Sequence, residues 1–274
     1  MLLLLLLALP MVAQDLDADF AKIVAEINQG RFDRARSQLS SVYMVIRQKT
    51  GGKSTPMDAN TQSRMRETGT VATVLNAIAL LKSQMDSKNY ADASAQEVLV
   101  GYWLGRLWFQ VPASQKLNYA KKDIEGAEPW MKEGLMQKLG YGAVDVREWA
   151  TAKQAATEMI VMSEQKDYRG ADPGALKHSA LTIRGLAEFG LGDVATAEKT
   201  LVESMRVRGE MIMRGSGPSF TLAQLLLKNG RRQAVDEFLV LVGESVWRES
   251  SKAADWRKDL AAGKEPNFGF WSIN

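Results

Sequence analysis

The spacing of apolar residues is the feature that most constrains the fold of this chain. From Leu16 onward they recur at intervals of three and four residues, and sustained alternation of apolar and polar residues is rare. A helix turns once every 3.6 residues, so this spacing gathers apolar side chains on one helix face, whereas a half-buried strand alternates with a period of two. The sequence therefore predicts an all-α fold.

Proline, glycine and capping residues indicate where the helices begin and end. Asp172 followed by Pro173 combines a capping carboxylate with a residue whose missing N–H costs nothing in the first turn of a helix. We expect helices over residues 16–29, 31–48, 61–87, 90–110, 114–139, 145–165, 173–190, 193–213, 218–229, 231–247 and 251–262. Glycines mark residues 50–61 and 139–145 as loops, and a weak domain boundary is expected near 140–145.

The first 13 residues form a separate segment. The apolar run from Leu2 to Val12 is shorter than the roughly 20 residues that span a bilayer, and small Ala13 follows it. We interpret residues 1–13 as a signal peptide cleaved near Ala13. The mature chain, residues 14–274, is then exported, periplasmic or secreted, without a membrane span. An uncleaved anchor is the alternative.

Charge and residue usage exclude several function classes. Lys and Arg number 35 against 32 Asp and Glu, and acids and bases alternate along the expected helices, as between Lys121 and Glu128. A basic stripe that tracks phosphates is not indicated, so we expect no nucleic acid partner. The chain has no cysteine, and His178 is its single histidine, which leaves no ligand set for a transition metal. We expect no metal and no cofactor.

Internal similarity carries more information than any single motif. Four short segments place a tight turn before a helix start and then an alanine. They begin at Gly30, Asn89, Gly192 and Gly230 and reach Ala35, Ala93, Ala197 and Ala234. Glycine permits the turn, and alanine permits a second helix to approach closely because it has no atoms beyond Cβ.

These turns and the helices before them resemble the tetratricopeptide repeat (TPR). The matching residues are Leu104, Gly105 and Trp108 before Ala120 and Ala127, Leu181 and Gly185 before Gly192, and Leu222, Ala223 and Leu226 before Gly230. The resemblance implies a TPR-like solenoid over residues 14–274, which is a right-handed α-α superhelix of antiparallel helix pairs. A nonrepeating helical bundle whose pairs share turn chemistry is the alternative.

The carboxy-terminal tail, residues 266–274, contains Phe268, Phe270 and Trp271. An exposed cluster of aromatic side chains favours aggregation. We therefore expect the tail to fold back over the last helix pair as a cap.

The repeat resemblance also implies a function. The first helix of each pair lines the concave surface of such a superhelix, so we expect a non-enzymatic protein that binds a peptide or protein partner, as a scaffold, without catalytic residues. The resemblance places six candidate ligand-binding residues on two first helices: Tyr102, Arg106 and Gln110, and Phe220, Gln224 and Lys228. Aromatic side chains would bury area against an extended peptide, while the polar ones would hydrogen-bond it.

Two other functions stay open. A helical periplasmic small-molecule-binding protein that accompanies a transporter would have a closed apolar pocket near Trp103 and Trp108. A cell-wall lytic enzyme is suggested by Glu244-Ser245 and by residues 134–137, which are similar to two parts of the soluble lytic transglycosylase signature. The two parts stand here in the opposite order from that family.

Overall fold

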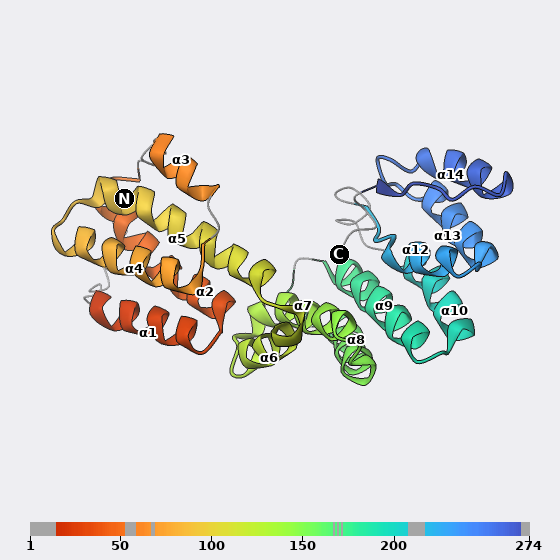
Figure 1. The fold of residues 1–274 in the computed structure, drawn as a ribbon, viewed down its shortest axis with the longest axis horizontal. Helices are drawn as coiled ribbons and strands as arrows, with labels where there is room; N and C mark the ends of the chain where they lie inside the picture. Colours follow the sequence, from red (N-terminus) through yellow and green to blue (C-terminus); the bar gives the residue numbers. More distant parts are fainter. Residues whose placement is uncertain are drawn as a thin grey trace, which may run out of the picture. The chain divides into compact units, whose positions relative to one another are not determined.

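The structure, a computed structural model, describes residues 15–52, 59–66, 69–166, 168, 170, 172–207 and 217–269. Within these ranges every regular element is a helix, which confirms the predicted all-α class (Figure 1). The chain divides into two compact units, residues 1–111 (unit 1) and 112–274 (unit 2). The expected signal peptide, residues 1–13, lies outside the described residues.

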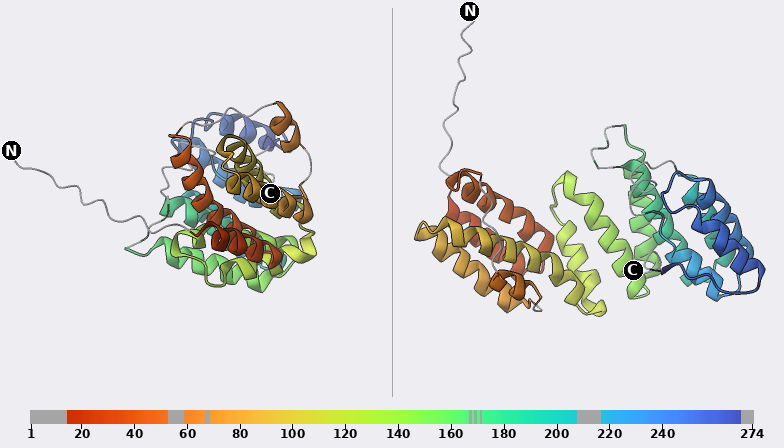
Figure 2. Two further views of the ribbon diagram at one scale, coloured as in Figure 1. Left: turned by 90° about the vertical axis from the view of Figure 1, so that its left-hand side faces the viewer. Right: turned by 90° about the horizontal axis from the view of Figure 1, so that it is seen from above.

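Unit 1 is built from two helical hairpins and one short helix. Its helices are α1 (Leu16–Asn28), α2 (Phe32–Lys49), α3 (Ala59–Met65), α4 (Val71–Asp86) and α5 (Tyr90–Gln110). In addition to the hairpin contacts of α1 with α2 and of α4 with α5, α2 packs on α5 and α1 packs on α4. The four long helices, seen side by side in Figure 2, therefore close into a four-helix bundle.

Neighbouring helices of this bundle run antiparallel. Lys82 near the end of α4 pairs with Asp17 near the start of α1, with Nζ 2.6 Å from Oδ1. Arg36, early in α2, lies over Gly105, late in α5. The helices α2 and α4 consequently run in the same direction, and the connection between them returns along the bundle. This differs from the serial stack that the repeat resemblance predicted, in which successive helices alternate in direction.

The return connection is held against α5 by α3 and Gly69. The guanidinium carbon of Arg64 on α3 lies 5.4 Å from the ring centroid of Trp103, which is fully buried. A Cβ at Gly69 would lie only 2.7 Å from Cγ of Trp103, so this position requires glycine. Thr70 then accepts a hydrogen bond from a first-turn N–H and starts α4. The prediction of one helix over residues 61–87 is therefore wrong.

Unit 2 is a series of helical hairpins. Its elements are α6 (Ala113–Ile124), the 3-10 helix η1 (Pro129–Met131), α7 (Lys132–Asp145), α8 (Trp149–Ser163), α9 (Pro173–Gly190), α10 (Val194–Met205), α12 (Thr221–Lys228), α13 (Arg232–Glu244) and α14 (Lys252–Ala261). The pairs α7/α8, α9/α10 and α12/α13 each form a hairpin. Since α9 packs on α7 and α8, and α12 packs on α9 and α10, each hairpin stacks on the one before it in sequence. The helix α6 packs on α7, and α14 packs on α13.

Glycines set the spacing between the first helices of successive hairpins. A Cβ at Gly140 on α7 would lie 2.7 Å from Cδ1 of Ile183 on α9. Likewise, a Cβ at Gly185 on α9 would lie 2.2 Å from Cδ2 of Leu222 on α12. The helices thus approach more closely than a larger residue would permit. Residues 139–145, predicted as a loop, belong to α7, where Gly140 serves close packing rather than chain reversal.

The break before α7 comes earlier than the sequence suggested. The helix predicted over residues 114–139 ends at Ile124, and Gly126 has a φ of 66°. Pro129 then opens η1. A left-handed glycine followed closely by proline ends a helix, because neither residue extends its hydrogen-bond ladder. The prediction of one continuous helix is wrong here.

The hairpin turns share one backbone conformation, the Schellman motif. In each turn one residue has a positive φ, and the residue after it donates its backbone N–H to the carbonyl oxygen five positions before the donor. Arg31, which follows Gly30, donates in this way to Glu26 at 2.9 Å. The positive-φ residues of the described hairpin turns are Gly30, Lys88, Arg147, Gly192 and Gly230. The residues five positions later are all buried: Ala35, Ala93, Ala152, Ala197 and Val235. The turn at Arg147 has neither a glycine nor the asparagine that marks the turn at Lys88, so the sequence did not indicate it.

Phe268, near the end of the described residues, belongs to the core of unit 2. Phe268 is fully buried, and its ring centroid lies 5.0 Å from that of Phe220 and 5.3 Å from that of Trp256. Phe270 and Trp271, which complete the aromatic tail, lie outside the described residues.

Candidate functional site

The three candidate groove residues of unit 1 lie one helical turn apart on α5. Tyr102 is half-buried, while Arg106 and Gln110 are exposed. Arg106 Nη1 donates a hydrogen bond to Tyr102 Oη at 2.7 Å, and the guanidinium lies 5.4 Å from the ring centroid. These two side chains therefore engage each other. The helix α5 is also the second helix of its hairpin, not a first helix as the repeat resemblance implied.

The three candidate residues of unit 2 are spaced along α12, from the residue that precedes the helix to its last residue. Phe220 precedes the helix and has no exposed surface, because its ring packs 5.4 Å from Phe238 and 5.1 Å from Trp256 between ring centroids. It is a core residue, and the prediction that it lines a groove is wrong. Gln224 is half-buried and Lys228 is exposed in the last turn.

Of the two tryptophans expected near a small-molecule pocket, Trp103 has a packing role. Trp103 is fully buried under α3 and Gly69. Trp108, further along α5, is half-buried. Trp103 thus fills the core of unit 1 rather than facing a ligand space.

His178 joins three segments of unit 2. Its Nδ1 lies 2.9 Å from the carbonyl oxygen of Ser204, and its Nε2 accepts a hydrogen bond from the backbone N–H of Ser219 at 2.9 Å. The ring is therefore neutral with the proton on Nδ1, and burial lowers the pKa of His178 below its ordinary value. Across the part of the chain that the structure describes, no group of His, Asp and Glu residues could hold a metal ion.

An apolar groove lies where the first helices of the three stacked hairpins end. We call it the turn-end groove, and its volume is about 310 Å³. Its lining residues come from α7, α8, α9, α12 and the turn between α7 and α8: Val144, Arg147, Trp149, Leu186, Phe189, Gly190 and Leu225. A Cβ at Gly190 would lie 2.4 Å from the ring of Trp149, so glycine lets the indole settle on the backbone of α9. No local sequence pattern indicates this groove, because its walls come from residues distant in sequence.

Arg147 is the one charged residue among the described lining residues of this groove. It has a φ of 62°, a left-handed conformation that L residues adopt at a cost. The side chain is exposed, and it has no hydrogen-bond or ion-pair partner among the residues that the structure describes. The groove thus combines apolar walls with one unpaired cation.

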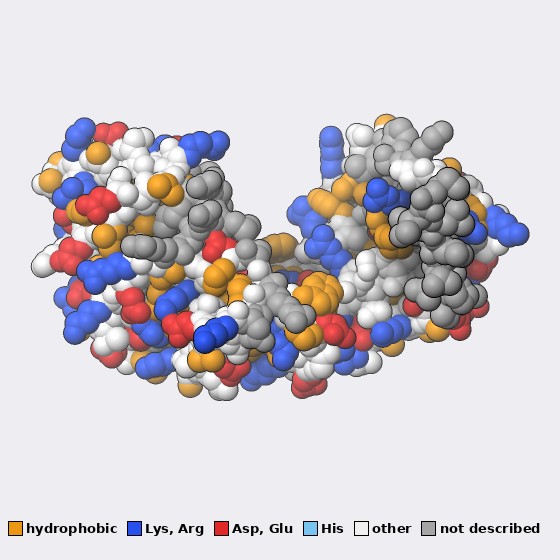
Figure 3. Space-filling model, turned by 180° about the vertical axis from the view of Figure 1, so that it is seen from behind, with side chains coloured by type: hydrophobic (Ala, Val, Ile, Leu, Met, Phe, Trp, Pro, Cys, Tyr) orange, Lys and Arg blue, Asp and Glu red, His pale blue; other side chains and the backbone are white. Residues whose placement is uncertain are grey.

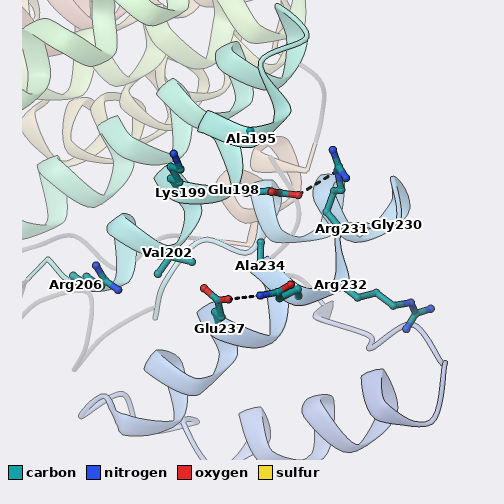
Figure 4. A pocket seen from close by; sticks show the side chains of 11 residues that line it. Ala195, Glu198, Lys199, Val202, Arg206, Gly230, Arg231, Arg232, Ala234 and Glu237 are labelled. Carbon is teal, nitrogen blue, oxygen red and sulfur yellow. Dashed lines mark hydrogen bonds and ion pairs between the residues drawn. The ribbon is translucent and has the colours of Figure 1, made fainter.

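A second, polar groove of about 600 Å³ lies between the second helices α10 and α13 (Figure 4). Arg231 Nε lies 3.2 Å from Glu198 Oε1, and Gln233 donates to Glu237 at 3.1 Å. Arg232 donates to the carbonyl oxygen of Gly263 after α14 at 2.9 Å. Much of the polar lining therefore already has intramolecular partners.

Charges of both signs mix over the visible surface. On the face drawn in Figure 3, the Lys and Arg side chains of both units are interspersed with Asp and Glu. This agrees with the alternation of acids and bases along the sequence.

The two fragments similar to the lytic enzyme signature lie on different helices. Glu244 is exposed at the end of α13, and residues 134–137 belong to α7. Each is part of a hairpin helix of unit 2.

Two further results bear on function. Among the described helices, none has the length and apolar composition needed to cross a membrane. Comparison of the chain with protein-family models, with curated proteins and with solved structures finds no match in any of the three.

Proposed function

We propose that this chain is a non-catalytic, TPR-like binding protein that holds a peptide segment of a protein partner in the turn-end groove. The observation that carries the proposal is that this groove crosses the first helices of three successive hairpins, α7, α9 and α12. Stacked helix pairs present such a continuous surface from their first helices. The serial stacking in unit 2 supports a short α-α superhelix there.

The lining of the turn-end groove favours an apolar anchor. Phe189, Leu225 and Trp149 present aromatic and aliphatic surface. Burying a large apolar side chain of a partner contributes roughly 1.5–3 kcal/mol, enough for a few anchors to dominate binding. The volume of about 310 Å³ stands at the lower end of the range for small-molecule sites and suits a small number of peptide side chains.

We propose that the protein binds its partner outside the cytoplasm. The leucine-rich run over residues 2–12 before Ala13 supports export and cleavage near Ala13. Without cysteine, the exported chain relies on packing for its stability.

Selection of random peptides displayed on phage tests this function directly. The full chain is immobilised, and enriched peptides are then measured as labelled synthetic peptides by fluorescence anisotropy. Leu225→Glu places a charge in the groove and should weaken their binding at least tenfold. Leu225→Gln, which adds no charge, should weaken it less.

The matched control is Val161→Glu, because Val161 is 55% exposed on α8 and lies outside the groove lining. This variant should bind the selected peptides as the parent chain does. Thermal melting by circular dichroism verifies that each variant is folded. Failure to enrich any peptide whose binding responds to Leu225→Glu would falsify the proposed function.

A further inference from the structure

The turn at Arg147 has a non-glycine residue in the left-handed conformation, which it shares with the turn at Lys88 and which distinguishes it from the turns at Gly192 and Gly230 in unit 2. Glycine occupies this position at Gly30, Gly192 and Gly230, where a positive φ causes no steric strain. Arg147 adopts a φ of 62° despite its Cβ. The backbone alone would therefore favour glycine at this position.

The side chain of Arg147 provides a positive charge that glycine would lack. It reaches the turn-end groove, where the other lining side chains are Val144, Trp149, Leu186, Phe189 and Leu225. Within the described ranges nothing pairs with its guanidinium. When a partner covers the apolar walls and displaces water from the exposed guanidinium, the local dielectric constant falls and pairing with a carboxylate strengthens.

From this arrangement we infer that the turn-end groove selects partner segments in which a large apolar residue is followed or preceded directly by Asp or Glu. The apolar side chain enters between Phe189 and Leu225, and the carboxylate pairs with Arg147. This inference rests on the proposed function, and it adds the chemistry of the partner.

Peptides taken from the phage selection provide the first test. The enriched sequences should place Asp or Glu beside Leu, Ile, Phe, Met or Trp. For one enriched peptide, its acid is replaced by the matching amide. This change should weaken binding to the parent chain about tenfold, which corresponds to about 1.4 kcal/mol.

Arg147→Gly is the decisive variant, because it removes the charge and relieves the left-handed strain together. It should melt at a higher temperature than the parent chain. It should bind the acidic peptide about tenfold more weakly, and it should bind the acidic and amide peptides equally. A loss of binding together with a gain in stability cannot come from unfolding. Arg147→Lys should retain part of the preference for the acid.

Lys88→Gly is the matched control, since Lys88 has a φ of 60° in the corresponding turn of unit 1. It should gain stability and leave peptide binding unchanged. If Arg147→Gly still prefers the acidic peptide over the amide, or if the enriched peptides lack acids, the inference is overturned. If Leu225→Glu abolishes peptide binding in that case, the proposed function still holds. If Leu225→Glu does not abolish binding, the proposed function is overturned as well.

Discussion

Ile183 of α9 packs directly on the backbone of Gly140 in α7, with its Cδ1 2.7 Å from where a Cβ of residue 140 would lie. The same relationship recurs one hairpin later, between Leu222 and Gly185. In both pairs a branched side chain occupies the space that glycine leaves. The stacking of first helices in unit 2, and with it the turn-end groove, depends on these contacts.

Gly140→Ala should destabilise unit 2. The added methyl must displace Ile183 or move α9, and overpacking of this kind costs about 1–3 kcal/mol. Gly134→Ala on the same helix is the control, because among the described atoms none lies within 4 Å of its Cβ position. That variant should gain roughly 0.5 kcal/mol from helix propensity. Urea denaturation followed by circular dichroism measures both, and equal effects of the two substitutions would refute the packing role of Gly140.

The shared turn conformation predicts opposite effects at two equivalent positions. Lys88→Gly should stabilise unit 1 by about 1 kcal/mol, because it relieves a left-handed residue. Gly192→Ala should destabilise unit 2 by a similar amount. Its φ is 85°, and no described atom stands within 4 Å of its Cβ position, so only backbone strain is added. Thermal melting checks both, and a stable Gly192→Ala would contradict the assignment.

The stability of unit 2 should fall as the pH drops through the range below 6.5. Burial depresses the pKa of His178 in the folded state, whereas the unfolded chain takes up its proton near the ordinary value of about 6.5. Below that pH the unfolded state binds the extra proton, which favours unfolding. Calorimetry between pH 5 and 8 should show this slope. In His178→Gln the decrease of stability with falling pH should be smaller, although the variant should melt at a lower temperature than the parent chain at pH 8. An unchanged pH dependence would exclude His178 as its source.

The stability of unit 1 should change with pH in the opposite direction. Burial raises the pKa of Glu97 on α5 to about 7. No hydrogen-bond or ion-pair partner for its carboxyl exists in the described part of the chain. The unfolded chain releases this proton near pH 4.5, so the folded state binds more protons between about 4.5 and 7 and loses stability as the pH rises through that window.

Glu97→Gln should therefore raise the melting temperature of unit 1 at pH 8 and flatten its pH dependence. Glu244→Gln, at an exposed position at the end of α13, serves as the control and should do neither. Hydrogen exchange measured by mass spectrometry assigns each change to its unit. A Glu97→Gln variant with parent stability at pH 8 would show that the carboxyl is well solvated.

Local signals in the sequence were sufficient to place several helices. The bounds expected for α5 and α9 coincide with those found, and Asp172 caps α9 by accepting a hydrogen bond from Gly174 N–H at 2.8 Å. These features depend on residues within one or two turns of each other. The packing roles of Gly69 and Gly140 could not be predicted, because they depend on Trp103 and Ile183, which are distant in sequence.

The candidate site was less accessible to sequence analysis. Phe220 has the same helical spacing whether it faces solvent or an aromatic core, and its burial depends on Phe238, Trp256 and Phe268. The turn-end groove draws its walls from α7, α8, α9, α12 and the α7/α8 turn. The local sequence signal for the α7/α8 turn is Ala-Thr-Ala at residues 150–152 after Arg147, which matches Ala-Thr-Ala at residues 195–197 after Gly192.

Periodicity, caps and turn residues act over a few residues, so the sequence was sufficient to predict a helical chain and four of its five described hairpin turns. How the hairpins assemble depends on tertiary contacts that these local signals do not specify. In unit 1 the connection carrying α3 returns along the bundle, so α4 runs parallel to α2 and four helices close into a ring. In unit 2 Gly140 and Gly185 let first helices stack in series. An apolar helix face is compatible with either arrangement, and the choice depends on contacts between residues far apart in the chain.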